Sequence, residues 1–260
     1  MLVTDQINHQ FELKSTPKRI ISLVPSQTEL LYDLGLEDEV VGITKFCIHP
    51  KKWFNSKTRV GGTKTVNFEK IAALQPDLII ANKEENTQVE IETLQKLYPV
   101  YTSDIYDLND SLKMMEAIGE ITNTSIKAKE IIAQIEKDFN ALKPINTARN
   151  KVLYFIWKNP YMTIGSDTFI HDMLNRCGFS HINVGSRYPE MVEEQIKEYN
   201  PDFIFLSSEP FPFKQKHIEE LRIICPKAKT RLVDGEMFSW YGSRLLKSVK
   251  YFIDLNDKIS

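Results

Sequence analysis

The longest amphipathic pattern in the chain runs from residue 125 to 142. Charged and amide side chains fill one side of this segment, and Pro144 follows it. Asn123 or Thr124 can supply the capping side chain at its start. The pattern predicts a helix roughly 27 Å long, at 1.5 Å per residue. Its apolar positions keep the three- and four-residue spacing of one helix face, at Ala128, Ile131, Ile132, Ile135, Phe139 and Leu142.

A second pattern occurs once before this helix and once after it. Glu69–Asp77 and Glu194–Asp202 both read Glu, any residue, Ile, four residues, then Pro-Asp. An apolar run follows each copy, at Leu78–Ile80 and at Phe203–Leu206. Each copy predicts a short helix, a turn made by Pro and Asp, and a buried strand. Agreement in residue type and spacing predicts two lobes of similar topology, joined by the central helix.

Predicted strands and helices alternate through both halves of the chain. Ser26–Glu29 has the spacing of a capping box that opens a helix, after a strand that Pro25 ends. Trp157–Met162 is expected to be an aromatic loop after a strand. The alternation predicts an α/β protein with mostly parallel sheets. We expect an N-terminal lobe at 1–122, a linker helix at 123–143 and a C-terminal lobe at 144–260.

Composition excludes several classes of protein. The 260 residues are 42% hydrophobic and 26% charged, and the net charge of −2 gives no electrostatic argument for a nucleic-acid partner. Residues 1–18 lack the apolar core of a secretory signal, so the chain is expected in the cytoplasm unless an export signal is missing from this sequence. Three cysteines without a CxxC pair argue against a disulfide framework or a cysteine-built zinc site.

Ligands of open α/β sheets bind beyond the carboxyl ends of the strands. The segments that follow the predicted strands are rich in aromatic and charged residues. Two such lobes facing each other would form an aromatic-lined cleft for a small molecule. The alternative for any one aromatic residue is that it packs beneath its own loop. These segments are Phe46–His49, Asn82–Asn86, Trp157–Met162, Glu209–Phe213 and Phe238–Tyr241.

Signatures of catalysis are weak. The chain contains no G-x-S-x-G, no Walker loop and no H-E-x-x-H, and Gly61–Lys64 lacks the spacing of a phosphate-binding loop. Cys47 and His49 suggest either a metal site or a thiolate nucleophile, but further ligands at suitable spacing do not accompany them. We therefore expect no catalytic residue and no metal site. An enzyme that uses Cys47 or His49 remains an alternative.

Several motifs in order resemble a known family over about residues 17–255. They are Pro25-Ser26-Gln27-Thr28-Glu29, Val41-Gly42, the loop at Pro50, Asn67-x-Glu69-x-Ile71, Pro76-Asp77-Leu78-Ile79 and the single linker helix. This arrangement resembles the substrate-binding proteins of ABC importers for cobalamin and ferric siderophores, and within them it is most similar to the cobalamin receptors. The resemblance implies two Rossmann-like lobes joined by a single long backbone helix. It also implies a ligand that is held between the lobes and is not chemically changed.

The resemblance assigns roles to particular residues. Glu69 and Glu194 match two glutamates that dock onto arginines of the membrane permease; the alternative is a carboxylate that the helix dipole favours at a helix start. Phe46, Tyr188, and Tyr161 or its neighbour Met162, match aromatic ligand contacts. The full expected set of ligand-binding residues is Phe46, His49, Lys64, Lys83, Trp157, Tyr161, Met162, Tyr188, Phe238, Trp240 and Tyr241.

The expected ligand is a corrinoid or an iron chelate, with no covalent cofactor. Lysines at the predicted cleft, which are Lys45, Lys64, Lys83 and Lys158, would suit an anionic chelate. The leading hypothesis is a monomeric receptor of an ABC importer in the periplasm or cell envelope, with the permease as its partner. The second is a soluble intracellular carrier or sensor of a similar ligand, and the third is an enzyme on the same scaffold.

Overall fold

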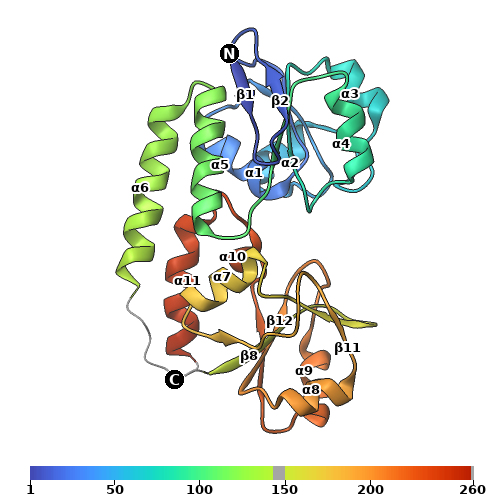
Figure 1. Cartoon of the computed structure of the whole chain (residues 1–260), viewed down its shortest axis with the longest axis vertical. Coiled ribbons are helices and arrows are strands. Elements are labelled where there is room, and N and C mark those ends of the chain that lie inside the picture. The colour runs from blue at the N-terminus through green and yellow to red at the C-terminus, as the bar shows by residue number, and fades with distance from the viewer. Residues whose placement is uncertain (143–149, 259–260) are drawn as a thin grey trace. The chain divides into compact units, whose positions relative to one another are not determined.

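Two sheets rich in parallel strands organise the chain, which the computed structural model describes at residues 1–142 and 150–258 (Figure 1). The chain divides into two compact units. Unit 1 comprises Met1–Ile105, Asn109–Ile135 and Tyr241–Arg244. Unit 2 comprises Tyr106–Leu108, Glu136–Trp240 and Leu245–Ser260. Each unit thus takes one short segment from the opposite half of the sequence. The division into lobes at 1–122 and 144–260 with a linker at 123–143 stays a proposal.

Unit 1 is built on a five-stranded sheet in the order β5-β4-β3-β6-β7, in which all neighbours are parallel. Its strands are β3 (Ile20–Ser22), β4 (Val40–Ile43), β5 (Thr58–Arg59), β6 (Leu78–Asn82) and β7 (Val100–Ser103). The helices between or after them are α1 (Pro25–Asp33), α2 (Lys51–Ser56), α3 (Phe68–Leu74), α4 (Gln88–Gln95) and α5 (Leu108–Ile121). Because the strands are parallel, their carboxyl ends meet at one edge of the sheet. Ile21, Leu23 and Ile79 pack with Ile71 and Leu94 in the core of this unit.

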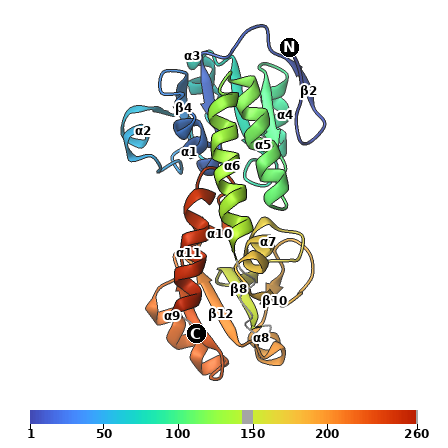
Figure 2. The ribbon, with the colours of Figure 1, turned by 90° about the vertical axis from the view of Figure 1, so that its left-hand side faces the viewer.

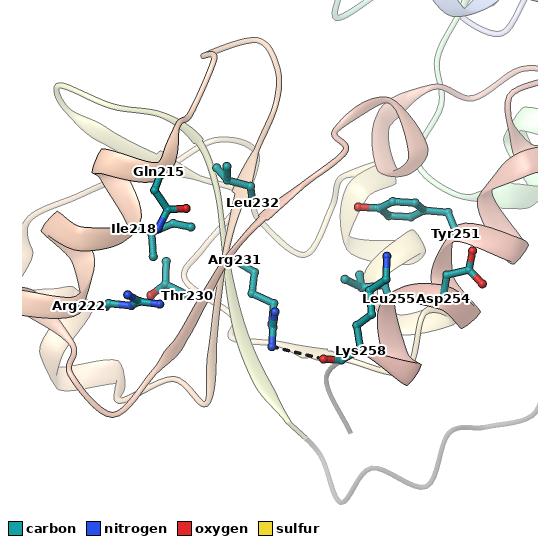
Figure 3. Close-up of a pocket in the computed structure, with 10 residues that line it drawn as sticks. All are labelled: Gln215, Ile218, Arg222, Thr230, Arg231, Leu232, Tyr251, Asp254, Leu255 and Lys258. Atoms are coloured by element: carbon teal, nitrogen blue, oxygen red, sulfur yellow. Dashed lines mark hydrogen bonds between the residues drawn. The ribbon is translucent and has the colours of Figure 1, made fainter.

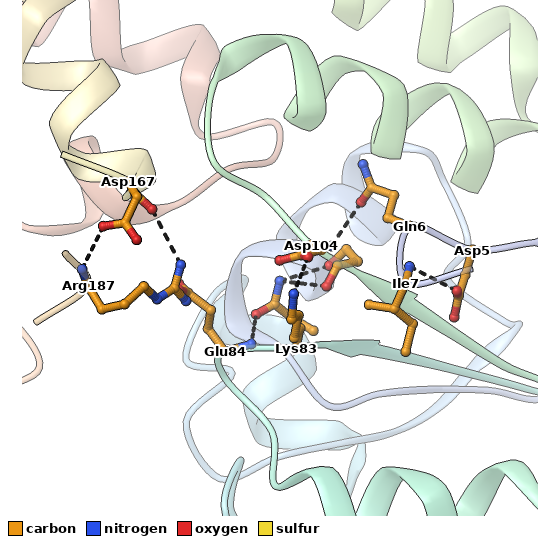
Figure 4. A network of polar contacts seen from close by, with 10 residues as sticks. Asp5, Gln6, Ile7, Lys83, Glu84, Asp104, Asp167 and Arg187 are labelled. Atoms are coloured by element: carbon orange, nitrogen blue, oxygen red, sulfur yellow. Dashed lines mark hydrogen bonds and ion pairs between the residues drawn. The ribbon is translucent and has the colours of Figure 1, made fainter. Parts of the chain in front are cut away.

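A short antiparallel hairpin that the sequence pattern did not predict precedes this sheet. It consists of β1 (Leu2–Thr4) and β2 (Gln10–Glu12). The Asp5 carboxylate accepts hydrogen bonds from the backbone N–H groups of Ile7 (3.0 Å) and Thr102 (3.0 Å). The Gln6 side-chain oxygen accepts another from Asp104 N–H (3.1 Å) (Figure 4). Polar side chains attach this hairpin to the end of β7, and Val3 and Phe11 at the centres of its two strands are buried.

Unit 2 is built on a mixed sheet. The order is β11-β9-β8-β12-β13, with β10 also paired to β8. Strands β10, β8, β12 and β13 are parallel to one another, whereas β9 and β11 add to the sheet in the antiparallel sense. The strands are β8 (Lys151–Trp157), β9 (Tyr161–Thr163), β10 (Ser180–His181), β11 (Glu190–Met191), β12 (Phe203–Ser207) and β13 (Lys229–Val233). The helices are α7 (Phe169–Arg176), α8 (Glu193–Tyr199), α9 (Gln215–Ile224), α10 (Glu236–Ser239) and α11 (Leu245–Asp257) (Figure 2).

The predicted α/β class is confirmed, and the antiparallel part of unit 2 corrects one detail of it. Trp157–Met162 is not one continuous loop, because Trp157 ends β8 and Tyr161 begins β9. Met162 pairs with Trp157 on one side and with Glu190 on the other. Short strands of two or three residues leave too little periodicity to be recognised in a sequence.

The long amphipathic helix is confirmed as α6 (Ser125–Ala141). Ala128, Ile131, Ile135 and Phe139 are buried along it, as the spacing predicts. The boundary between the two units falls within this helix, after Ile135. A side chain on Gly119 of α5 would come within 2.5 Å of the Ala128 Cβ, so the close packing of α5 and α6 requires glycine there. Pro144, which is expected to end the pattern, lies outside the described residues.

The duplicated motif forms the same local structure in both units. In unit 1, α3 is capped by Gln75, whose backbone is left-handed (φ 45°, ψ 60°), and Pro76-Asp77 leads into β6. In unit 2, α8 is capped by Asn200 in nearly the same conformation (φ 42°, ψ 62°) before Pro201-Asp202 and β12. The left-handed residue ends the helix, and the proline that follows cannot continue it. The predicted sequence of helix, turn and buried strand is therefore correct in both copies.

The aspartate of each motif holds the start of the neighbouring strand. The Asp77 carboxylate accepts hydrogen bonds from Lys18 N–H (2.7 Å) and Arg19 N–H (2.8 Å), and Asp77 N–H donates to the Arg19 carbonyl (3.0 Å). The Asp202 carboxylate accepts from Lys151 N–H (2.8 Å), and Asp202 N–H donates to the Lys151 carbonyl (2.9 Å). Each aspartate thus exchanges two hydrogen bonds with one residue at the start of β3 or β8. We call this arrangement the aspartate clamp.

The predicted capping box at Ser26–Glu29 is wrong. Helix α1 begins at Pro25, with Val24 at the N-cap and no side-chain capping bond. Proline suits this first position because its fixed φ is helical and its missing N–H would have no partner there. Thr28 Oγ1 donates instead to the Val24 carbonyl (2.8 Å), and Glu29 pairs with Arg244 (2.8 Å between Oε2 and Nε). Arg244, which is distant in the sequence, therefore pairs with Glu29, the side chain that the capping box was expected to use.

We expect Asp77→Ala to lower the free energy of unfolding by about 1–2 kcal/mol, because two backbone N–H groups lose a charged acceptor. Asp202→Ala should cost about 1 kcal/mol, since one backbone N–H loses its carboxylate. Urea unfolding followed by circular dichroism measures both.

Asp38→Ala is the matched control, because Asp38 is exposed and no hydrogen bond or ion pair of its side chain is found within the described part of the chain. It should change the free energy of unfolding by less than about 0.5 kcal/mol. Equal stability of Asp77→Ala and Asp38→Ala would show that the clamp does not stabilise the fold.

Candidate functional site

In unit 1, an exposed aromatic and a cation lie together at the carboxyl edge of the sheet. Phe46 follows β4, and its side chain is 51% exposed. The Lys45 ammonium lies 5.0 Å from the centre of the Phe46 ring. Gly62 lies beneath both, because a Cβ at that position would come within 3.3 Å of Phe46 and 3.4 Å of Lys45. His49, from the same loop, is half-buried. Phe46 therefore presents a supported ring face on which a flat ligand can stack.

Cys47 lies under this loop and is not reactive by the usual criteria. Its Sγ is fully buried, 3.1 Å from Thr28 Oγ1 and 3.2 Å from Thr44 Oγ1. Burial raises the pKa of the thiol, because the charged thiolate is poorly solvated there. A thiolate nucleophile needs exposure and a lowered pKa. The enzyme alternative built on Cys47 is therefore not supported.

Two of the three predicted lysines of unit 1, Lys64 and Lys83, already have polar contacts. Lys64 Nζ donates to the Glu84 carbonyl and lies 3.4 Å from the Asn86 carbonyl. Lys83 Nζ pairs with the Asp104 carboxylate at 2.5 Å (Figure 4). Both ammonium groups therefore hold loops together at the carboxyl edge. The positive charge that they offer to a ligand is smaller than the sequence alone suggests.

In unit 2, a group of aromatic side chains follows β8 and β12. Trp157 is 41% exposed, and its ring centre lies 5.6 Å from that of Phe211. Tyr161 is half-buried against Phe155 (5.3 Å between ring centres), and burial raises the pKa of its hydroxyl to about 12. Met162 follows it in β9 and is also half-buried. Lys158 pairs with Glu220, and its ammonium lies 6.0 Å from the centre of the Tyr161 ring.

A second aromatic and cationic group in unit 2 surrounds Arg187. The guanidinium carbon lies 5.6 Å from the ring centre of Tyr106 and 5.8 Å from that of Tyr188. The Asp167 carboxylate accepts a hydrogen bond from Arg187 N–H (2.6 Å), and the Asp167 carbonyl accepts one from the guanidinium (3.3 Å) (Figure 4). Tyr188 was expected at the site, but Arg187 and Tyr106 were not. Tyr106 comes from a segment far away in the sequence, and no local pattern indicates that it joins this group.

Phe238 must be removed from the predicted ligand set. Its side chain is 0% exposed, and its ring centre lies 4.9 Å from Phe252 and 5.5 Å from Tyr154. It packs in the core of unit 2, so no surface of it is available to a ligand. Position after a predicted strand placed Phe238 in the set, but α10 turns this side chain inward. Trp240 and Tyr241 are also buried, although each keeps a small exposed fraction.

A half-buried carboxylate, Glu209, belongs to this edge and is absent from the predicted set. Its Oε1 accepts hydrogen bonds from Ser239 Oγ (2.7 Å) and from the Trp240 indole N–H (2.9 Å). Burial raises the pKa of Glu209, because the ionised form is poorly solvated. Its position directly after β12, within a segment already expected to face the ligand, was the available signal. Perturbed carboxyl groups of this kind are typical of functional sites.

The two predicted docking glutamates occupy equivalent positions. Glu69 is the second residue of α3, and Glu194 is the second residue of α8. Both side chains are exposed. Within residues 1–142 and 150–258, no hydrogen bond or ion pair holds either carboxylate. The helix dipole favours a carboxylate at this position, and an exposed carboxylate is also available to a basic partner.

No group of three or more His, Cys, Asp or Glu residues that could hold a metal ion is present in the described part of the chain. None of its described helices is both long and apolar enough to cross a bilayer.

The chain belongs to the Periplasmic binding protein family, which it matches over residues 20–222. It is 31% identical over 215 residues to an ABC transporter substrate-binding lipoprotein of Bacillus subtilis, covering 78% of this chain and 67% of the relative. It is 28% identical over 195 residues to a vitamin B12-binding protein of Vibrio parahaemolyticus, covering 73% of this chain and 70% of the relative. The family resemblance drawn from the sequence motifs is thereby confirmed.

Solved structures share the fold. A possible iron-binding (periplasmic solute-binding) protein of Staphylococcus epidermidis is 25% identical, with a TM-score of 0.77 that covers 94% of this chain and 99% of that one. The periplasmic vitamin B12 binding protein of Vibrio cholerae is 22% identical, with a TM-score of 0.73 over 93% and 98%. The periplasmic heme binding protein of Vibrio cholerae is 20% identical, with a TM-score of 0.79 over 93% and 99%. The two Vibrio structures support the fold alone.

We expect Glu209→Gln to raise the melting temperature at pH 7. The glutamine oxygen can accept the same two hydrogen bonds without placing a charge on this half-buried group. Because the pKa of Glu209 is higher in the folded than in the unfolded state, its ionised form destabilises the fold at neutral pH. Lowering the pH through the pKa that Glu209 has in the folded state should therefore stabilise the wild type relative to Glu209→Gln.

Calorimetric scans at several pH values measure this difference. The fluorescence of Trp240, whose indole donates to Glu209, provides a local signal that should titrate only in the wild type. An equal pH dependence in both proteins would contradict the raised pKa.

Proposed function

We propose that this chain is the solute receptor of an ABC-type importer, and that it binds a metal chelate with a flat or aromatic framework and delivers it to a membrane permease. The match to the Periplasmic binding protein family over residues 20–222 carries this proposal. The named relatives support it, because they include an ABC transporter substrate-binding lipoprotein and vitamin B12-binding proteins. By likeness to them, we propose that the chain acts in the cell envelope as a monomer.

The chemistry of the carboxyl edges supports a chelate as the ligand. Phe46 in unit 1 and Trp157 in unit 2 expose ring surface, and aromatic faces stack on macrocycles. Lys45 beside Phe46 and Arg187 beside Tyr188 add positive charge. We propose that carboxylate groups of the chelate meet these cations, since a guanidinium or ammonium favours an anionic group. A corrinoid, a haem and a ferric siderophore are the classes that we would test first.

The remaining predicted residues keep a supporting role in this proposal. His49, Tyr161, Met162 and Tyr188 are half-buried and can contribute contact surface. Lys64 and Lys83 shape the loops, since both are held by carbonyl or carboxylate groups. Trp240 acts with Glu209, through the hydrogen bond that joins them. Tyr241 stays a candidate, and Phe238 is excluded.

The right chelate should raise the melting temperature, because binding only the folded state stabilises it by mass action. At a free concentration of 100 times Kd, the stabilisation is about 2.7 kcal/mol. Differential scanning fluorimetry with cyanocobalamin, hemin, a ferric hydroxamate and the free metal ions tests this directly. Phe46→Ala should weaken the binding of the chelate that shifts the melting temperature by about 3- to 10-fold.

Tyr199→Ala serves as the aromatic control, because Tyr199 is exposed at the end of α8, away from the carboxyl ends of the strands. The affinity of Tyr199→Ala for the chelate should match that of the wild type. Failure of every chelate to shift the melting temperature would argue against a chelate receptor, and an equal loss in both variants would remove Phe46 from the site.

The double variant Glu69→Ala with Glu194→Ala should abolish most ligand uptake while leaving Kd within about twofold, because the two exposed carboxylates contact the permease rather than the ligand. Uptake by membrane vesicles that contain the partner importer measures the first quantity, and calorimetric titration measures the second. Glu116→Ala with Glu198→Ala is the control, since both glutamates are exposed, one on each unit. Unchanged uptake in the first double variant would refute the docking role.

A further inference from the structure

The outer strand of the unit 2 sheet has one side without a partner strand. β13 lies at the end of the strand order and pairs with β12 in parallel. Lys229 N–H donates to the Asp202 carbonyl (2.9 Å), and the Val233 carbonyl accepts from Ser208 N–H (3.0 Å). This register turns the backbone groups of residues 229, 231 and 233 toward β12. The N–H and C=O groups of Thr230 and Leu232 therefore point away from it, and no described strand pairs with that side.

A groove of about 430 Å³ runs along this open edge (Figure 3). Its floor is Thr230–Leu232, and one face of α9 and one face of α11 form its two walls. The lining positions recur every three or four residues on each helix, as expected for a single helix face. They are Gln215, Ile218 and Arg222 on α9, Tyr251, Asp254 and Leu255 on α11, and Lys258 directly after α11.

The groove carries an excess of positive charge. Arg222, Arg231 and Lys258 line it, and Asp254 is the acidic residue among its lining residues. Asp254 is already paired with Lys250, at 2.8 Å. Arg231 extends toward α11, where its guanidinium lies 3.4 Å from the Lys258 carbonyl (Figure 3). Among the described residues, no carboxylate pairs with Arg222, Arg231 or Lys258, so an occupant with carboxylates would meet these three cations.

Two further features of the floor favour an extended chain as the occupant. Leu232 is 42% exposed, although it lies in a strand. Thr230 is only 6% exposed, and its Oγ1 has no hydrogen-bond partner among the described residues. A buried hydroxyl without a partner is unfavourable, so a backbone group that reaches it would be bound favourably.

We propose that this groove binds an extended, acidic peptide segment of a partner protein, which adds to β13 as a further strand of the sheet. The outward N–H and C=O groups of Thr230 and Leu232 supply the backbone hydrogen bonds, as in other cases of strand addition. Arg222, Arg231 and Lys258 select carboxylate side chains on the added strand. This surface is separate from the carboxyl edge of the sheet and does not depend on the proposed ligand.

Protection against aggregation explains only part of this arrangement. Lysine and arginine on an edge strand discourage pairing with other strands, and Lys229 and Arg231 have that effect on a second copy of β13, because like charges would lie opposite each other. The same reason does not explain Arg222 on α9 and Lys258 directly after α11, which also line the groove. A second copy is therefore a poor occupant, and an acidic strand is a good one.

The probe is an acetylated and amidated heptapeptide of alternating glutamate with valine or threonine, titrated into the isotopically labelled full chain. We expect amide shifts centred on Thr230 and Leu232, and hydrogen exchange at these two amides slowed at least about 10-fold at saturation. The same peptide with N-methylated inner residues keeps its charge but loses its backbone donors, and it should bind at least about 10-fold more weakly.

Arg231→Glu should weaken binding of the probe at least about 10-fold, because it reverses a charge on the floor. Lys197→Glu on α8 is the control for net charge and should stay within about twofold, since Lys197 does not line the groove. Circular dichroism verifies that both variants are folded. The proposal is overturned if the probe does not bind at about 1 mM, if the N-methylated peptide binds equally well, or if the protected amides lie elsewhere.

Discussion

The aspartate clamp is the constraint on which the arrangement of the strands depends. In each unit, an aspartate directly before a central strand exchanges two hydrogen bonds with the first residues of the neighbouring strand, at Arg19 or Lys151. A shift of one residue in that register would move every apolar side chain to the opposite face. By fixing where β3 and β6, or β8 and β12, begin together, the clamp also fixes where their opposite ends lie. Trp157 and Glu209 lie at those ends, at the end of β8 and after β12.

Buried polar contacts then give these loops a defined shape. Asn86 is 4% exposed, accepts a hydrogen bond from Asn82 N–H (2.8 Å) and donates to the Thr63 carbonyl (2.9 Å). The ion pair of Glu29 with Arg244 is almost fully buried and attaches a C-terminal segment to α1. Such a pair adds little net stability compared with apolar packing, but loss of either partner leaves a buried charge. The ion pair of Glu29 with Arg244 therefore serves mainly to position the C-terminal segment.

Internal polar contacts of this kind also change how the lysines of the candidate site are interpreted. Lysines near a binding site are usually counted as charge for the ligand, yet Lys64 and Lys83 are held by carbonyl and carboxylate oxygens of their own unit. The cations supported by aromatic rings, Lys45 and Arg187, are better placed to recognise an anionic group. A receptor that uses few cations and several rings suits a large, flat ligand with carboxylates at its rim.

Sequence by itself determined the α/β class, the central helix, the duplicated motif and the family. Those features rest on local spacing: apolar residues at helical intervals over 125–141, and the repeat of Glu, Ile, Pro and Asp in one order. Phe46 follows a strand, as expected, and is 51% exposed, whereas Trp157 ends its strand; a role for either in ligand binding stays a prediction. Each of these signals lies in a short stretch of neighbouring residues, and the duplication and the family follow from several such stretches in order.

Only the tertiary structure decided which side chains are available. Phe238 and Trp157 are both aromatic residues in segments that follow predicted strands. Phe238 packs against Tyr154 and Phe252, whereas Trp157 is exposed. Glu29 has the position of a capping residue in the sequence, but in the structure it pairs with Arg244. Tyr106 lies beside Arg187, from which it is distant in the sequence. Burial and pairing depend on contacts between segments distant in sequence, and such contacts leave no periodic signal in the segments that make them.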